Sequence, residues 1–320
     1  MSLVITLCLL TILSSIPSIL SLDIGTVDLE DKFFETASAQ VFNNTGSGIL
    51  NKTAESTISA DRSLFVKLLA DNLENRLNKS AAILEITGEL PQVKNTSYAS
   101  SISSELHGIP KDLDIAKRKV AQDIIASDKD LQQIFFLMQN GDTYMEEPYS
   151  RQQNLTGLNF AFRDYYKGAV STGDTYLGNI VISASSGLPL SVLAVPLYSS
   201  TSNNTNNGNR SNSNTTLLGI WSGGLNLTEF SESLQSLNLT DGERIVYVDQ
   251  NGQKAADSNK QLFRTNQNES FANLQAFNNT LQEQKSGSVM EMINGTRMFV
   301  FYEPVQFHST TWAVLLLKPL

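Results

Sequence analysis

The stretch NFAFRDYYKGA, Asn159 to Ala169, places Arg163 beside two adjacent tyrosines, Tyr165 and Tyr166. It is followed by GNIVISASSGLPLSVLAVPLY, in which two apolar runs are divided by Ser186-Gly187. Apolar runs separated by a glycine-containing turn predict a pair of strands. A guanidinium is a permanent cation, and its planar fork of donors fits a carboxylate. The stretch therefore joins candidate binding chemistry to the start of a sheet.

The composition argues against several classes of function. The 320 residues carry a formal net charge of −9 without a run of Lys and Arg, so nucleic acid is not an expected partner. The single cysteine, Cys8, allows no internal disulfide. The two histidines, His107 and His308, lack a cysteine partner and metal-binding spacing, so we expect no His/Cys metal site. Because no G-x-S-x-G, P-loop or G-x-G-x-x-G motif occurs, we expect neither an enzyme nor a cofactor.

Several other polar residues have ordinary explanations. Glu146 and Glu147 are expected to be solvated acids. Asp249, Asn251 and Gln253 have the alternate spacing of a calcium loop, but the loop's distal glutamate is missing. A turn between two strands explains these three residues better.

The N-terminal segment and the asparagines point to export. Residues 1–22 include about 20 uncharged residues, enough to cross a membrane as a helix. No Lys or Arg precedes this run, so an uncleaved anchor is favoured over a cleaved signal, with residues after about 23 extracytoplasmic. A secreted protein is the alternative.

Thirteen N-x-[ST] sequences are expected to carry glycans on an external surface, although an Asn/Thr-rich surface also collects such sequences without modification. They begin at Asn43, Asn51, Asn78, Asn95, Asn154, Asn203, Asn209, Asn214, Asn226, Asn238, Asn268, Asn278 and Asn294.

The first half of the chain is expected to be mainly helical before it turns to strands. A polar lead-in at 23–50 precedes a long amphipathic helix over about Thr53–Ile86, because apolar residues recur at three-, four- and seven-residue steps. Gly88 and Pro91 end it. A second helical region is predicted over about Lys111–Gln133, followed by a hairpin whose turn is Asn140-Gly141-Asp142.

Two sets of strands follow this helical part. LLGIWSGGLNL reads as another strand, and Thr228–Leu237 as a short helix. The segment between Ser199 and Thr216 is too polar to join a core and is expected to be a flexible loop. RIVYVDQNGQKAAD reads as a second hairpin, and GSVMEMINGTRMFVFYEPV with TTWAVLLLKPL as three more strands.

In these features the chain resembles a double Cache sensor domain, the extracytoplasmic ligand-binding module of many receptor kinases and chemoreceptors. The resemblance rests on the element order and on FFLMQNGDTY, FRDYYKGA with the strands after it, and LLGIWSGGLNLTEF. It implies an α+β fold in which a long N-terminal helix carries two PAS-like units with antiparallel sheets. The expected parts are a stalk helix at 51–90, a membrane-distal ligand-binding unit at 91–237 and a membrane-proximal unit at 238–320.

The resemblance also implies a ligand site in the membrane-distal unit. Arg163 matches an arginine that faces a ligand carboxylate in many relatives, and the family commonly has Trp-Tyr where Tyr165 and Tyr166 stand. The alternative for Arg163 is an ion pair with Asp164 or a surface acid. Further residues expected at the pocket wall are Tyr176, Tyr144 and Trp221, and Ser183 is included by alignment.

The sequence departs from the amino-acid-binding relatives at three positions. Leu158 stands where those relatives have a tyrosine, and Ser183 and Gly224 stand where acids receive the ligand's ammonium group. A buried ammonium without an acceptor is strongly disfavoured. A small carboxylate, or another neutral-to-anionic metabolite, is therefore the favoured ligand.

The favoured function is signal input, with a homodimer through the long helix as one candidate assembly. Relatives continue into a second membrane helix and an output domain, whereas this sequence ends at Leu320, so a separate signalling partner is one expectation. The alternative is a cell-surface glycoprotein that uses the same fold for binding or assembly without signalling. An Arg163 far from any cavity would favour that alternative.

Overall fold

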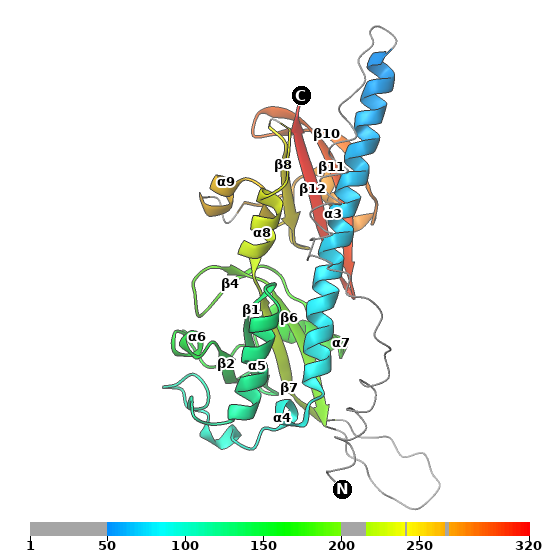
Figure 1. Cartoon of the computed structure of the whole chain (residues 1–320). Helices are drawn as coiled ribbons and strands as arrows, with labels where there is room; N and C mark the ends of the chain where they lie inside the picture. Colours follow the sequence, from blue (N-terminus) through cyan, green and yellow to red (C-terminus); the bar gives the residue numbers. More distant parts are fainter. Residues whose placement is uncertain (1–49, 200–215, 241, 266–268) are drawn as a thin grey trace, which may run out of the picture. The chain divides into compact units, whose positions relative to one another are not determined.

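The computed structural model describes residues 50–199, 216–240, 242–265 and 269–320 (Figure 1). The predicted anchor at 1–22 and lead-in at 23–50 lie outside this part, apart from Leu50, and so does the interior of the predicted loop between Ser199 and Thr216. Within the described ranges, no helix is both long and apolar enough to cross a membrane.

The first described element is one long helix, α3 (Leu50–Gly88). A stripe of its residues, at three- and four-residue steps, is no more than 4% exposed: Val66, Leu69, Leu73, Leu77, Ala81 and Leu84. The helix predicted over Thr53–Ile86 is confirmed. It ends at Gly88, and Pro91 opens the short helix α4 (Pro91–Lys94).

The first sheet has five antiparallel strands in the order β2-β1-β7-β6-β3. Its strands are β1 (Leu131–Met138), β2 (Thr143–Glu147), β3 (Tyr176–Leu177), β6 (Val192–Ser199) and β7 (Thr216–Leu225). Alternate residues of a strand face opposite sides. Ile134 and Phe136 accordingly join the core that contains α3, whereas Phe135 and Leu137 join a separate cluster with residues of α7 (Asp164–Thr172). The first sheet is therefore covered on both faces.

Shorter elements complete the part of the chain around the first sheet. They are the single turn η1 (Ala99–Ser101), α6 (Tyr149–Gln153) and the two-stranded ladder of β4 (Val181–Ile182) with β5 (Pro189–Leu190). The turns predicted at Asn140-Gly141-Asp142 and Ser186-Gly187 are both present. Gly141 has a φ of +86°, a conformation that favours glycine.

The helical region predicted over Lys111–Gln133 is wrong at both ends. The helix is α5 (Ile115–Ser127), and its N-cap is Asp114, whose side chain accepts a hydrogen bond from the Lys117 backbone N–H. After α5, the Asp128 carboxylate accepts hydrogen bonds from the Ser80 hydroxyl and the Asp130 backbone N–H. These bonds fix a turn at 128–130, and β1 starts directly after it.

The second sheet also has five antiparallel strands, in the order β10-β11-β12-β8-β9. Its strands are β8 (Arg244–Val248), β9 (Lys254–Asp257), β10 (Gly287–Ile293), β11 (Thr296–Phe307) and β12 (Thr310–Pro319). The helices α8 (Leu227–Gln235), α9 (Lys260–Thr265) and α10 (Gln275–Gln282) accompany it. Both predicted hairpins, the final strand and the helix predicted over Thr228–Leu237 are confirmed.

One core cluster contains residues of α3 and of both sheets, including Leu77, Trp221 and Trp312. The long helix thus packs against two antiparallel sheets, and the predicted α+β fold is confirmed (Figure 1).

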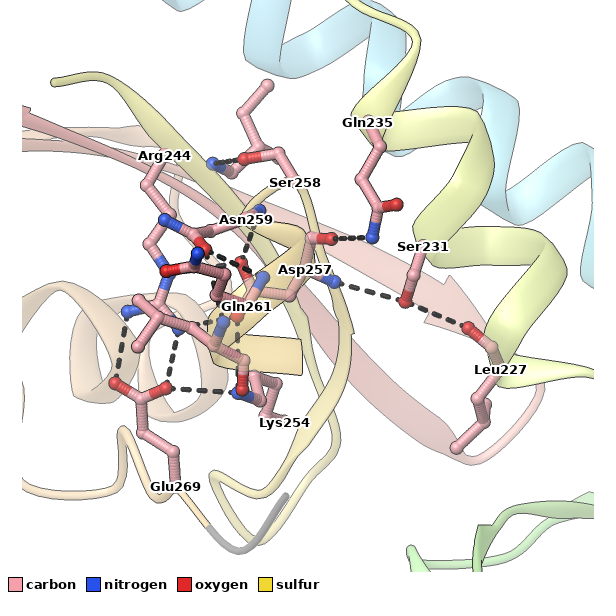
Figure 2. A network of polar contacts seen from close by, with 12 residues as sticks. Leu227, Ser231, Gln235, Arg244, Lys254, Asp257, Ser258, Asn259, Gln261 and Glu269 are labelled. Atoms are coloured by element: carbon pink, nitrogen blue, oxygen red, sulfur yellow. Dashed lines mark hydrogen bonds and ion pairs between the residues drawn. The ribbon is translucent and has the colours of Figure 1, made fainter. Parts of the chain in front are cut away.

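A buried ion-pair network joins β8, β9 and the segment after α9 (Figure 2). The Arg244 guanidinium contacts the Asp257 carboxylate at 2.6 Å and the Glu269 carboxylate at 2.5 Å. The Lys254 ammonium contacts the same two carboxylates at 3.1 and 3.2 Å. The two positive and two negative charges of the network therefore cancel, in a region where Asp257 is fully buried and Lys254 is 3% exposed.

Strand β9, which contains Asp257, is also hydrogen-bonded to α8. The Gln235 side-chain N–H donates to the Asp257 carbonyl at 3.2 Å, and the Asp257 backbone N–H donates to the Ser231 hydroxyl at 3.3 Å (Figure 2). The network consequently fixes β9 both to β8 and to the helix that follows the first sheet.

Candidate functional site

A pocket opens on the face of the first sheet that carries the α7 cluster, opposite the face that packs on α3. Its free space is about 380 Å³, including the opening to solvent. Strands β1, β2, β5 and β6, helix α7 with the loop before it, and the segment around β4 supply its lining: Gln133, Phe135, Leu137, Thr143, Glu146, Leu155, Phe160, Arg163, Tyr165, Val181, Ile182, Ser183, Ala184, Ser185, Leu190 and Val192.

Arg163 lies in this lining, at the N-cap position of α7. One of its amino groups donates to the Ile182 carbonyl at 3.1 Å, and its Cζ lies 5.2 Å from the centre of the Phe162 ring. No acid of the described residues lies within ion-pair distance of the guanidinium, so the predicted alternative of an Arg163–Asp164 pair is not formed. The Asp164 carboxylate instead accepts a hydrogen bond from the Asn179 backbone N–H. Arg163 is a partly exposed cation with donors available to a ligand.

Tyr165 and Ser183 lie in the same pocket. The Tyr165 side chain is 6% exposed and packs edge-on against Phe135, with ring centres 6.0 Å apart. Burial raises the pKa of Tyr165 above its ordinary value, so the hydroxyl stays neutral. The Ser183 hydroxyl accepts hydrogen bonds from the backbone N–H groups of Ser185 and Ser186, which fixes the turn at this wall.

The other four predicted site residues lie outside the pocket lining. The Tyr166 hydroxyl donates to the Gln139 carbonyl at 2.5 Å, and the Tyr176 ring packs against Gly168. On the opposite face, the Tyr144 hydroxyl donates to the Asp114 carboxylate at 2.7 Å. The Trp221 indole N–H donates to the Thr87 hydroxyl of α3 at 3.1 Å. These four side chains thus have partners within the protein, and the structure groups only Arg163, Tyr165 and Ser183.

The prediction that Glu146 and Glu147 are solvated acids is wrong. Their exposed fractions are 3% and 4%, because all five residues of β2 are buried. Glu147 pairs with the buried Arg118 at 2.7 Å. Glu146 points to the other side of the strand and lines the pocket. Two adjacent acids normally indicate an exposed strand, so no local pattern indicated this pocket carboxyl.

The Glu146 carboxyl has little compensation for its burial. The pKa of Glu146 is raised to about 7, mainly because the carboxyl is buried. The charge of Glu147 also raises this pKa, whereas a hydrogen bond from Ser185 and the charge of Arg151 lower it. The Ser185 hydroxyl is 3.2 Å from the carboxylate. Near neutral pH the group therefore exchanges between a charged acceptor and a neutral donor.

Gln133 adds an unsatisfied polar atom to the lining. Its side-chain oxygen is buried and has no hydrogen-bond partner within the described part of the chain. A Cβ at Gly224 would lie 2.5 Å from the Gln133 Cγ, so no side chain fits at the position aligned with a ligand-binding acid. An unpaired buried acceptor costs about 1–3 kcal/mol, which a ligand donor would offset.

The predicted glycosylation sites remain predictions. Among those described, Asn78, Asn95, Asn154, Asn238 and Asn294 are exposed. Asn226 and Asn278 are partly exposed, and their side-chain N–H groups already donate to the carbonyls of Lys129 and Leu274. Outside the described residues lie Asn43, Asn203, Asn209, Asn214 and Asn268, and the side chain of Asn51 is not described either.

The Asp249 turn connects the second sheet to the segment before β4. One Asp249 oxygen accepts hydrogen bonds from the Asn251 and Gln253 backbone N–H groups, which confirms the predicted strand turn. The other accepts from the Ile180 backbone N–H at 2.8 Å. Ile180 directly precedes β4, so the pocket wall is hydrogen-bonded to the second sheet. Among the described residues, no three His, Cys, Asp or Glu side chains gather as a metal site.

Comparisons with known proteins agree with this architecture. A family model described as Cache domain matches residues 48–320. The ligand-binding domain of the Pseudomonas fluorescens chemoreceptor CtaA, in complex with L-isoleucine, has 14% identity and a TM-score of 0.55, over 84% of this chain and 94% of that one. The ligand-binding domain of the Pseudomonas aeruginosa PAO1 chemoreceptor PctC, in complex with GABA, has 17% identity and a TM-score of 0.53, over 82% and 99%.

An extracellular domain described as that of a histidine kinase, rpHK1S-Z16, has 13% identity and a TM-score of 0.60, over 85% of this chain and 97% of that one. No curated protein matches the chain significantly. These structural similarities establish the fold, and the family model covers most of the sequence. The chain therefore belongs to the Cache domain family.

Proposed function

We propose that this chain is an extracytoplasmic sensor domain whose pocket on the first sheet binds a small carboxylate through Arg163. Cache domains are ligand-binding sensor domains of membrane receptors. The observation that carries the proposal is an arginine in the pocket lining without an acidic partner among the described residues. A planar guanidinium can hold both oxygens of a carboxylate.

The same proposal gives the two sheets different roles. Residues 91–237 would form the ligand-binding unit and residues 238–320 the unit that passes on the signal. The hydrogen bonds from Arg163 to the Ile182 carbonyl and from the Ile180 N–H to Asp249 support this arrangement. A ligand that draws Arg163 away from Ile182 would act on a segment attached to the second sheet. Such an effect requires unequal affinity of the ligand for two states.

Any polar group that the ligand carries besides its carboxylate is expected to contact the polar residues of the pocket lining. The sequence argues against amino acids because the aligned positions lack an acid for the ammonium group. Glu146 supplies a carboxyl in this pocket, so that argument no longer holds. The CtaA and PctC domains are complexes with L-isoleucine and GABA, which each carry an amino and a carboxylate group. Hydroxy- and amino-carboxylates are consequently the two classes to compare.

Replacing Arg163 by alanine should strongly weaken carboxylate binding. L-Lactate and L-alanine are suitable probes, because they differ in a hydroxyl against an ammonium group. We expect Arg163→Ala to weaken binding of the responsive probe roughly 30- to 150-fold, since a charge-assisted hydrogen bond contributes about 2–3 kcal/mol. Isothermal titration calorimetry measures the change.

Arg297→Ala is the matched control, because Arg297 is an exposed arginine of the second sheet. This variant should bind like the wild-type protein. Equal affinities of wild type and Arg163→Ala would contradict the proposed site and favour a surface glycoprotein without a ligand at Arg163.

A further inference from the structure

We infer that Glu146 makes ligand binding proton-linked: the pocket takes up a proton at this carboxyl when it binds a carboxylate, and therefore binds the anion more tightly in acid. The inference rests on the proposed function of the pocket and specifies its regulation. It applies to a ligand that carries no ammonium group near Glu146.

The first observation is the isolation of the carboxyl. Glu146 lines the pocket at 3% exposure, and no cation of the described chain lies within 4 Å of it. Its side-chain hydrogen bond comes from the Ser185 hydroxyl at 3.2 Å, a neutral donor. Glu147, by contrast, is paired directly with Arg118. Two adjacent acids thus have different environments, and only the one in the pocket lacks a countercharge.

The surrounding elements do not supply that countercharge. Three neighbouring side chains are neutral: Gln133 of β1, and Ser183 and Ser185 of the segment between β4 and β5. From α6, the charge of Arg151 acts on Glu146, but the two groups form no ion pair. One amino group of Arg151 donates to the Gln132 side chain at 2.8 Å, and the other is buried without a partner among the described residues. From α7, Tyr165 is neutral, and Arg163 donates to the Ile182 carbonyl.

A bound carboxylate would place a second negative charge in this pocket. Like charges in one site raise the pKa of the remaining acid, and burial has already raised the pKa of Glu146 to about 7. The complex therefore keeps Glu146 protonated, with the proton taken from solvent. Its hydroxyl then donates a hydrogen bond to an oxygen of the ligand. A ligand ammonium would act in the opposite direction, because it favours the charged carboxylate.

Calorimetric titration with L-lactate tests this linkage. Lactate stays ionised from about pH 6 to pH 8, so the change in affinity reports on the protein. We expect binding about tenfold weaker at pH 8 than at pH 6, because the fraction of protonated Glu146 falls by that factor. Repeating the titration in buffers of different ionisation enthalpy measures the proton taken up.

Glu146→Gln should bind lactate with the affinity of the wild type at pH 6 and without this pH dependence, because glutamine mimics the protonated acid. Glu105→Gln, a change at an exposed acid, should keep the wild-type profile. Arg163-dependent lactate binding that does not change with pH, or that strengthens as pH rises, would overturn the inference while the proposed function stands. If neither lactate nor alanine binds through Arg163 at any pH, both this inference and the proposed function are contradicted.

Discussion

Replacing Asp257 by alanine should lower the free energy of unfolding by about 3–5 kcal/mol, the range for removing one partner of a buried ion pair. Asp257 is fully buried and contacts both Arg244 and Lys254. Without it, two cations share the single carboxylate of Glu269. The backbone bonds between residue 257 and α8 do not depend on the side chain. The carboxylate also accepts a hydrogen bond from the Asn259 backbone N–H at 2.8 Å, so the loss reports on the ion network together with this turn. Urea denaturation at neutral pH measures the change.

A second substitution separates charge imbalance from lost packing. Lys254→Met in the Asp257→Ala background restores the balance of one cation and one anion. We expect the double variant to recover at least about 1 kcal/mol relative to the sum of the two single effects. Additive losses would show that Lys254 and Asp257 are not energetically coupled, and an Asp257→Ala loss below about 1 kcal/mol would show that the network contributes little to stability.

Glu146→Gln should change the pH dependence of stability. The pKa of Glu146 is raised from an ordinary 4.5 to about 7 in the folded protein. Between these values the folded state holds a proton that the unfolded state has released, so this contribution to stability is complete below pH 4.5 and is lost as pH rises to 7. A shift of this size corresponds to roughly 3 kcal/mol.

Denaturation curves of both proteins from about pH 4 to pH 8 measure this difference. Wild type should lose roughly 3 kcal/mol relative to Glu146→Gln across that range, and above about pH 8 the two profiles should have similar slopes. Parallel stability profiles over the whole range would mean that Glu146 titrates normally in the folded protein.

The order of elements was largely predictable from local patterns. The stripe on α3 and the Asn-Gly turns of the hairpins depend on residues close in sequence, and these predictions are confirmed. The extent of α5 could not be predicted in this way, because the turn after it depends on a hydrogen bond to Asp128 from Ser80, 48 residues away. Long-range contacts of this kind leave no periodic signal.

The candidate site was only partly predictable. Resemblance to a family pointed to Arg163, Tyr165 and Ser183, which the structure brings into one pocket. It could not separate them from Tyr144 and Trp221, whose strands place them on the opposite face. Glu146 was missed because the environment of the two acids depends on residues distant in sequence: Ser185 contacts Glu146, and Arg118 pairs with Glu147.

The structure of a complex with the responsive probe tests carboxylate binding at Arg163 most directly. We expect the ligand in the pocket on the first sheet, with its carboxylate about 2.7–2.9 Å from the Arg163 guanidinium and the bond to the Ile182 carbonyl altered. A ligand bound elsewhere, or one in this pocket whose carboxylate does not contact Arg163, would contradict it.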